Sequence, residues 1–193
     1  NIQFLVFLMA VIKAVDEYAD LLRISVASAG NDHRLGANEA PPAVVSIFLG
    51  DELTEILKSI ENDTYFTSHG AVQMDIGATV LPHFVKDNTD RNRTSPFAFT
   101  GNKFEFRMLG SAASVANPNI VLNTAVAEAL DQFAKELDGI APEDMEHAVH
   151  ELIKRAIKKH KRVIFNGNGY TDEWIEEAEK RGLYNLKSTP DAL

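Results

Sequence analysis

The sequence predicts a mixed α/β fold of the α+β type, with helices packed on an antiparallel sheet and a helical C-terminal tail. Two short apolar stretches joined by a tight turn predict strands, and longer stretches with apolar residues every three or four positions predict helices. Of the 193 residues, 45% are hydrophobic and 24% are charged, which is typical of a globular protein that buries a full core.

The first long helix is expected over Phe4–Ile24, where charged residues lie between apolar residues at helical spacing. The apolar run Ile2–Ile12 is shorter than the about 20 residues that a membrane span needs. It also lacks the basic segment that opens a signal peptide. We therefore interpret it as a buried helix, and we expect the chain, which begins at Asn1, to be part of a longer protein.

Signals for a loop, a strand and a short helix come next. Gly30–Asp32 indicate a loop, and Pro41–Pro42 exclude a helix at their position. Val44–Leu49 predicts a strand. Asp51–Ile60 predicts a short helix, because its two leading carboxylates suit the positive N-terminus of a helix.

The predicted sheet lies in the middle of the chain. Residues 61–92 mix polar residues with two short apolar stretches, and we expect an irregular excursion with one hairpin there. Phe97–Phe99 and Lys103–Leu109 predict two strands, joined by a tight turn at Thr100–Asn102.

Helices dominate the last part of the chain. Asn119–Leu137 carries the clearest apolar stripe, and Gly139 ends it. Glu143–His160 predicts a second amphipathic helix, and Val163–Phe165 a short strand. Thr171 can cap a further helix that ends at a glycine. The sequence thus divides near Gly139 into a mixed part and a helical tail.

Composition excludes some classes of function. The net charge of −9 argues against a nucleic-acid-binding protein, which needs clustered Lys and Arg to neutralise phosphates. The chain has no cysteine, so it has neither a disulfide framework nor a thiolate zinc site, which agrees with a reducing cytoplasm.

The strand around Glu105 carries the most informative polar pattern. Successive side chains of a strand point to opposite faces, so Lys103, Glu105 and Arg107 share one face. Three charges of mixed sign in a row are also typical of a solvated outer face of a sheet. From this strand alone, both interpretations stay open.

Two further clusters favour a site for an anionic substrate. Arg91 and Arg93 lie in a polar stretch just upstream of the strands, and Arg34 and Glu39 flank a glycine-bearing loop. The planar guanidinium group gives paired hydrogen bonds to phosphates and carboxylates. A carboxylate among such arginines pairs with them or binds a hard cation such as Mg²⁺. The residues alone therefore predict a site for a phosphorylated substrate with a metal, without naming the reaction.

Four segments in the same order resemble motifs of the glutamine synthetases. His33–Pro42 resembles the flap motif of that family, and Arg91–Ser95 resembles its phosphate-binding stretch. Lys103–Arg107 resembles its Arg-x-Glu-x-Arg strand, and Ala116–Asn119 resembles its Ala-Asn-Pro-Tyr helix start. The resemblance covers residues 1–137, and the length and sequence of the tail indicate the large type III class.

The resemblance implies a domain division and a reaction. Residues 1–139 would be the C-terminal part of the catalytic domain, with a class-specific insertion at 50–90, and residues 140–193 a helical extension. The family ligates ammonia to glutamate through a γ-glutamyl phosphate intermediate, with ATP as co-substrate and Mg²⁺ or Mn²⁺ as cofactor. The resemblance also implies a cytoplasmic homo-oligomer, expected to be a dodecamer, without nucleic-acid or membrane partners.

The motif positions imply catalytic roles for three residues. Glu39 on the flap would close over the acyl phosphate and accept a proton from ammonium. Arg93 would contact the ATP phosphates and the phosphoryl group in flight, and Arg107 would neutralise the glutamate or the phosphoryl group.

The same motifs imply three binding roles. Arg34 would hold a glutamate carboxylate, Lys103 would lie near the nucleotide, and Glu105 would ligate one of two metal ions. Two positions depart from the family pattern. Lys103 stands where many members carry Arg and so lacks the bidentate fork, and Thr94 stands where Ser is usual.

Two alternatives to glutamine synthesis remain open. A γ-glutamyl–amine ligase shares these motifs and uses an amine in place of ammonia. A non-catalytic assembly or binding module would keep the fold without the chemistry. The remaining metal ligands and the ammonium-binding residues of the family are expected upstream of Asn1, so we expect the 193-residue piece alone to be inactive.

Overall fold

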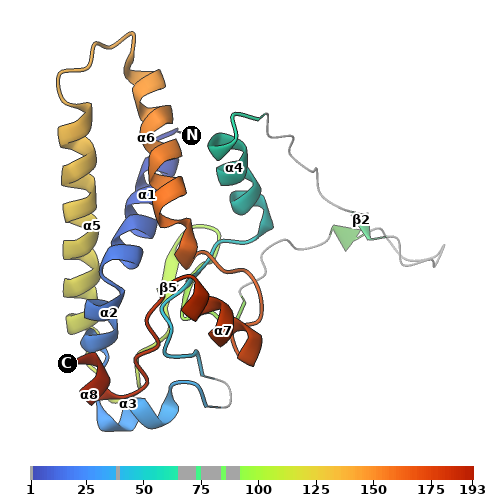
Figure 1. Ribbon diagram of the computed structural model, residues 1–193, viewed down its shortest axis with the longest axis vertical. Helices are drawn as coiled ribbons and strands as arrows, with labels where there is room; N and C mark the ends of the chain where they lie inside the picture. Colours follow the sequence, from blue (N-terminus) through green and yellow to red (C-terminus); the bar gives the residue numbers. More distant parts are fainter. Residues whose placement is uncertain (1, 38–39, 65–72, 75–83, 86–91) are drawn as a thin grey trace.

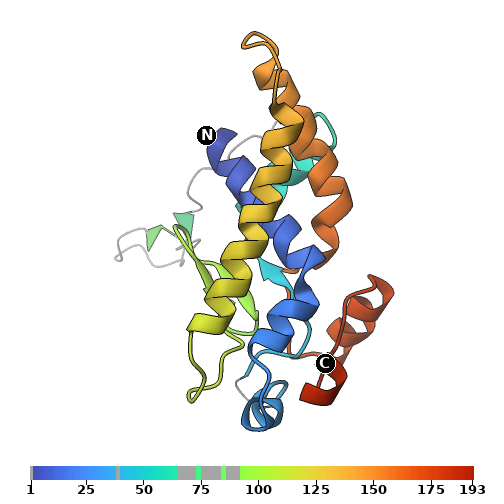
Figure 2. The same cartoon turned by 90° about the vertical axis from the view of Figure 1, so that its left-hand side faces the viewer.

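The computed structural model describes residues 2–37, 40–64, 73–74, 84–85 and 92–193. Two long helices, α5 (Ala116–Leu137) and α6 (Met145–His160), pack against α1 (Ile2–Glu17), and all three run along the long axis (Figure 1). A small sheet lies beside this bundle, as Figure 2 shows from the side. The predicted mixed α/β fold with a helical C-terminal tail is confirmed.

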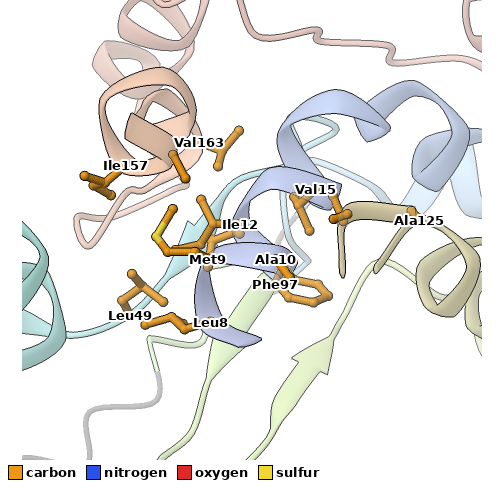
Figure 3. Packing of buried hydrophobic residues seen from close by; sticks show 14 of the residues in the cluster. Leu8, Met9, Ala10, Ile12, Val15, Leu49, Phe97, Ala125, Ile157 and Val163 are labelled. Atoms are coloured by element: carbon orange, nitrogen blue, oxygen red, sulfur yellow. The ribbon is translucent and has the colours of Figure 1, made fainter. Parts of the chain in front are cut away.

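Helix α1 lies at the centre of the hydrophobic core. Its residues Leu8, Met9 and Ile12 are at most 1% exposed. Figure 3 shows them between side chains of the tail (Ile157 and Val163) and side chains of the sheet and of α5 (Phe97 and Ala125). The tail therefore shares one core with the mixed part of the chain.

The first predicted helix is bent at Tyr18. It divides into α1 and α2 (Ala19–Ser25), but the backbone hydrogen bonds continue across the bend. Tyr18 donates to the carbonyl of Ala14 at 3.0 Å and accepts from Leu22 at 3.0 Å. None of the described helices is both long enough and apolar enough to span a membrane.

The prediction of a loop at Gly30–Asp32 is wrong, because these residues lie inside the short helix α3 (Ala29–Arg34). Ser28 caps α3 with its side chain, which accepts a hydrogen bond from the backbone N–H of Asn31 at 3.2 Å. Such a cap satisfies a donor that would otherwise lack a partner in the first turn. The cap and the tertiary contacts of α3 outweigh the loop preference of Gly, Asn and Asp.

The three-stranded sheet has the order β1 (Ile47–Phe48), β4 (Phe97–Phe99), β5 (Phe104–Phe106). As predicted, β4 and β5 are antiparallel, with Phe97 opposite Phe106. β1 runs parallel to β4, so the sheet is mixed and the predicted antiparallel arrangement holds only for β4 and β5. A parallel pair needs a long crossover, and the connection here includes helix α4 (Asp51–Glu61).

Both predicted outer strands are shorter than expected. Of Val44–Leu49 only two residues form β1, and of Lys103–Leu109 only three form β5. In the region predicted to contain a hairpin, β2 (Gln73–Met74) and β3 (Phe84–Val85) form an antiparallel pair. Apart from residues 61–64 and 92, the rest of that region lies outside the described residues.

The tail continues from α6 through a 3-10 turn at Lys161–Val163. The short strand predicted at Val163–Phe165 is reduced to a bridge, in which Ile164 lies beside Ile47 of β1. Helix α7 (Asp172–Lys180) begins after its predicted cap Thr171, and α8 (Thr189–Ala192) ends the chain.

Candidate active site

Strand β5 and the residues next to it carry three charged side chains, Lys103, Glu105 and Arg107, which we call the charged row. Nη2 and Nε of Arg107 donate to Oε2 of Glu105 at 3.0 and 3.3 Å, and Nζ of Lys103 lies 3.7 Å from Oε1 of Glu105. The shared face predicted for these three residues is therefore present. The hydrogen bonds from Arg107 hold the pKa of the Glu105 carboxyl below its usual value, because they stabilise the charged form.

The opposite face of the same strand belongs to the core. The ring of Phe104 stacks on Phe97 at a centroid distance of 5.1 Å, and Phe106 lies 5.8 Å from the same ring. Met108 is fully buried. Because the apolar face is anchored in this way, the charged row points out of the core, with the Glu105 side chain 32% exposed.

Arg107 also connects the charged row to the segment that carries Arg93. Its Nη1 donates to the carbonyl oxygen of Asn92 at 2.7 Å, so the residue before Arg93 is bonded directly to the strand. The side chain of Arg93 is exposed and makes no hydrogen bond or ion pair with the described residues.

Arg34 lies against the backbone that directly follows β5. Its Nη2 donates to the carbonyl oxygens of Arg107 and Leu109 at 3.2 and 2.7 Å. Asn31 orients the guanidinium group, because its Oδ1 accepts from Nε of Arg34 at 3.1 Å. The structure thus brings together Arg34, Arg107 and, through Arg107, Glu105.

Asn31 is a positioning residue that the sequence did not reveal. It is 2% exposed, and its Nδ2 donates to the carbonyl oxygens of Val26 and Met108, both at 2.8 Å. It therefore fastens α3 to the end of the charged strand. The only signal in the sequence was its place one turn before Arg34, and this signal was hidden because the segment was predicted to be a loop.

A cavity of about 410 Å³ lies beside Arg34. Small and polar residues from the α2–α3 connection and from the loop before α5 line it, among them Ser28, Asn31 and Asn117. Glu105 and Arg107 do not line it. The cavity therefore borders Arg34 but not the carboxylate–guanidinium pair of Glu105 and Arg107.

Two sequence-predicted residues fall outside the described part of the chain. Glu39 and Arg91 are not among the residues that the structure places. Among the described residues on either side of Glu39, the N–H of Gly36 donates to the carbonyl of Pro41 at 2.9 Å. Gly36 has a φ of +77°, a conformation that favours glycine.

The charged row can supply one ligand, the Glu105 carboxylate, to a divalent cation. Mg²⁺ and Mn²⁺ prefer carboxylate oxygens, and Glu105 offers one that is ionised and partly exposed. Among the described residues, Glu105 belongs to no group of three metal-ligating side chains. The remaining ligands of a metal bound here would have to come from elsewhere in the protein or from substrate.

A second cluster of metal-ligand type lies between α4 and α6. It consists of Asp63, His150 and Glu151. Lys154 forms an ion pair with Asp63, and this pairing holds the pKa of the Asp63 carboxyl below its usual value. The cluster is therefore explained by contacts within the protein.

Comparison with known proteins agrees with the geometry. Residues 148–193 match the family model described as glutamine synthetase C-terminal domain. The whole chain is 55% identical to a glutamine synthetase from Butyrivibrio fibrisolvens and 54% identical to a type-3 glutamine synthetase from Dictyostelium discoideum. It is 44% identical to a glutamine synthetase from Bacteroides fragilis. In each match the chain spans about a quarter of the relative, 26 to 27% of its length.

The comparisons thus agree with the resemblance that the four motifs indicated. By sequence the chain belongs to the glutamine synthetase family, over all of its 193 residues. The name of the Dictyostelium relative agrees with the expected type III class.

Proposed function

We propose that the complete protein carrying this chain ligates ammonia to glutamate with ATP, through a γ-glutamyl phosphate intermediate. The observation that supports this most is the charged row itself. Glu105 and Arg107 lie on one strand face, Arg34 lies against that strand, and the segment of Arg93 is bonded to Arg107. The relatives that match the whole chain are named glutamine synthetases.

Phosphoryl transfer depends mainly on positioning and on neutralising charge, and this site is equipped for both. Arg93 would contact the ATP phosphates, with Lys103 near the nucleotide. Arg107 would stabilise the charge that develops on the transferred group. Glu105 would hold one of the Mg²⁺ or Mn²⁺ ions, which supply charge neutralisation at the phosphates.

Two residues would act on glutamate and ammonium. Nε and Nη2 of Arg34 are bonded to the protein, and Nη1 has no partner among the described residues. Arg34 would therefore bind a glutamate carboxylate through Nη1. Glu39 would close over the acyl phosphate, exclude water and accept a proton from ammonium. In this proposal the protein would act in glutamine biosynthesis, in the cytoplasm, as a homo-oligomer that the resemblance implies to be a dodecamer.

The experiment is an assay of the complete protein with glutamate, ATP and Mg²⁺. We expect glutamine to form with ammonia in a one-to-one ratio to phosphate, and ATP or a phosphinothricin-type analogue to raise the melting temperature. Product formation with a larger amine but not with ammonia would indicate the γ-glutamyl–amine ligase. No product and no stabilisation by ATP would indicate a non-catalytic module.

A further inference from the structure

A turn in the C-terminal tail is bonded to both neighbours of Arg93. We call Asn166–Gly169 the tail turn. Nδ2 of Asn92 donates to the carbonyl oxygens of Asn166 and Gly167 at 3.2 and 2.8 Å. The N–H of Gly169 donates to Oγ1 of Thr94 at 2.8 Å. The tail turn is therefore hydrogen-bonded to the residues immediately before and after Arg93.

The segment Asn92–Thr94 is itself closed by side-chain hydrogen bonds. Oδ1 of Asn92 accepts from the N–H of Thr94 at 3.2 Å and from its Oγ1 at 2.6 Å. Asn92 has a φ of +32°, which is uncommon for a residue other than glycine and is tolerated best by Asn and Asp. The conformation that presents Arg93 thus depends on the bonds of Asn92 and Thr94.

The tail turn is in turn anchored to the sheet and to α4. Oδ1 of Asn166 accepts from the N–H groups of Leu49 and Gly50 at 3.1 and 3.2 Å, and its Nδ2 donates to Oγ1 of Thr54 at 2.8 Å. The ring of Phe165 stacks on buried Trp174 at a centroid distance of 3.7 Å. The turn is consequently a fixed support.

The contact at Gly169 leaves no room for a side chain. A Cβ atom there would lie 2.7 Å from the carbonyl oxygen of Thr94, which is a backbone atom and cannot rotate away. Any larger residue would therefore push the backbone at Thr94, one residue from Arg93. This close approach is what makes glycine necessary at this position.

We propose that the tail turn positions Arg93 for the phosphates of ATP, and that Thr94 and Gly169 are the positioning residues. This inference rests on the proposed function, because it takes Arg93 to be a phosphate ligand. The exposed guanidinium group of Arg93 has no other support among the described residues, so its reach is set by the backbone of its segment. A displacement of about 1 Å in a positioning group can cost two orders of magnitude in rate.

The test uses Thr94→Val and Gly169→Ala in the complete protein. Thr94→Val keeps the shape of the side chain but removes the hydroxyl that accepts from Gly169. We expect both variants to raise the dissociation constant of ATP, measured by calorimetry, and the KM for ATP about tenfold. The KM for glutamate should stay within about twofold, because Arg34 is not bonded to the tail turn.

Two controls separate positioning from stability. Thr94→Ser keeps the hydroxyl and should restore ATP affinity to within about twofold of the wild type. Phe133→Leu alters a buried residue of α5, so it should lower the melting temperature without changing the KM for ATP. In an Arg93→Ala background, Thr94→Val should cause no further loss of ATP affinity, because the two residues act as one unit.

Each failure has its own signature. Wild-type protein that binds ATP but forms no glutamine overturns the proposed function, and the ATP affinities of the variants still decide on the tail turn. Unchanged ATP affinity in both variants overturns the positioning role. So does an equal loss in the KM for glutamate, or a Thr94→Val effect that persists in full without Arg93.

Discussion

At the scale of single residues, Arg107 uses all three nitrogens of its guanidinium group. Nε and Nη2 donate to the Glu105 carboxylate, and Nη1 donates to the carbonyl of Asn92. A lysine keeps the charge but has neither the planar fork nor this reach in two directions. We expect Arg107→Lys to lower the turnover of the complete protein by an order of magnitude or more, since the loss of such a transition-state contact costs about 3 kcal/mol.

The measurement is the rate of glutamine formation at saturating substrates. Arg155→Lys is the matched control, because Arg155 lies on α6 and pairs with Glu136 away from the charged row. It should leave the turnover unchanged, as expected for an exposed ion pair. Equal turnover in the two variants would show that Arg107 does not take part in the reaction.

Glu39→Ala should separate ATP consumption from glutamine formation. Phosphoryl transfer can continue without this carboxylate, but the acyl phosphate would be exposed to water and ammonium would lose its base. We expect phosphate to be released while glutamate is recovered unchanged. The assay follows phosphate and glutamine together, with Glu146→Ala, an exposed residue of α6, as the control. A fall of both products in strict proportion would contradict the flap assignment.

Alternation along a strand was enough to predict which residues of the site share a face. It placed Lys103, Glu105 and Arg107 together, because the side-chain period of a strand is two residues. It did not predict Asn31 or Asn166. Their amides bond to backbone groups far along the chain, such as Met108 and Leu49, and no local pattern encodes such contacts.

At the scale of the elements, the buried carboxylate of Asp16 joins α1 to the end of α6 and to the 3-10 turn that follows it. Nδ1 of His160 lies 2.7 Å from Oδ2 of Asp16, and Nε of Arg162 donates to Oδ1 of Asp16 at 2.6 Å. The side chains of Asp16 and His160 are 5% and 3% exposed. Both oxygens of one buried carboxylate are thus used to fix the tail to the first helix.

Asp16→Ala should therefore destabilise the fold strongly. Removing the buried carboxylate takes an acceptor from Nε of Arg162 and the partner from Nδ1 of His160, which is 3% exposed, and such a loss costs about 1 to 3 kcal/mol. The check is urea denaturation of the 193-residue chain, followed by circular dichroism. Asp20→Ala, an exposed position of α2, should change the free energy of unfolding by no more than about 0.5 kcal/mol. Equal denaturation midpoints would show that the Asp16 group contributes little.

Length decided which elements could be predicted from the sequence. The two long amphipathic helices α5 and α6 repeat their apolar stripe over several turns, so both were expected with their C-terminal ends at the observed residues. Helix α3 has six residues, too few for a stripe, and forms through its Ser28 cap and the bonds of Asn31 and Arg34. The strands shorten because pairing partners, which the sequence does not name, set their ends.

At the scale of the whole molecule, the tail is also bonded to the mixed part of the chain beside two of the candidate site residues, Arg93 and Arg34. The tail turn supports the segment of Arg93; farther along, Leu186 is bonded to Arg23, and Thr189 at the start of α8 is bonded to Asp32. Arg23 is 1% exposed and donates to the carbonyl of Leu186 at 2.7 Å and to Asp32 at 2.7 Å. Since Asp32 belongs to α3, the tail also braces the helix that carries Arg34.

A fold that is well braced but supplies only part of a site should be stable and inactive. The chain spans about a quarter of its relatives, and Glu105 belongs to no group of three metal-ligating side chains among the described residues. We therefore expect the 193-residue chain alone to unfold cooperatively in circular dichroism but to form no glutamine from glutamate, ammonia and ATP. Its affinity for Mg²⁺, measured by calorimetry, should be weak, because most coordination positions would be left to water. The complete protein should form glutamine and should bind Mg²⁺ more tightly than the 193-residue chain does. Robust glutamine formation by the 193-residue chain alone would show that the missing ligands and the catalytic groups are all contained within it.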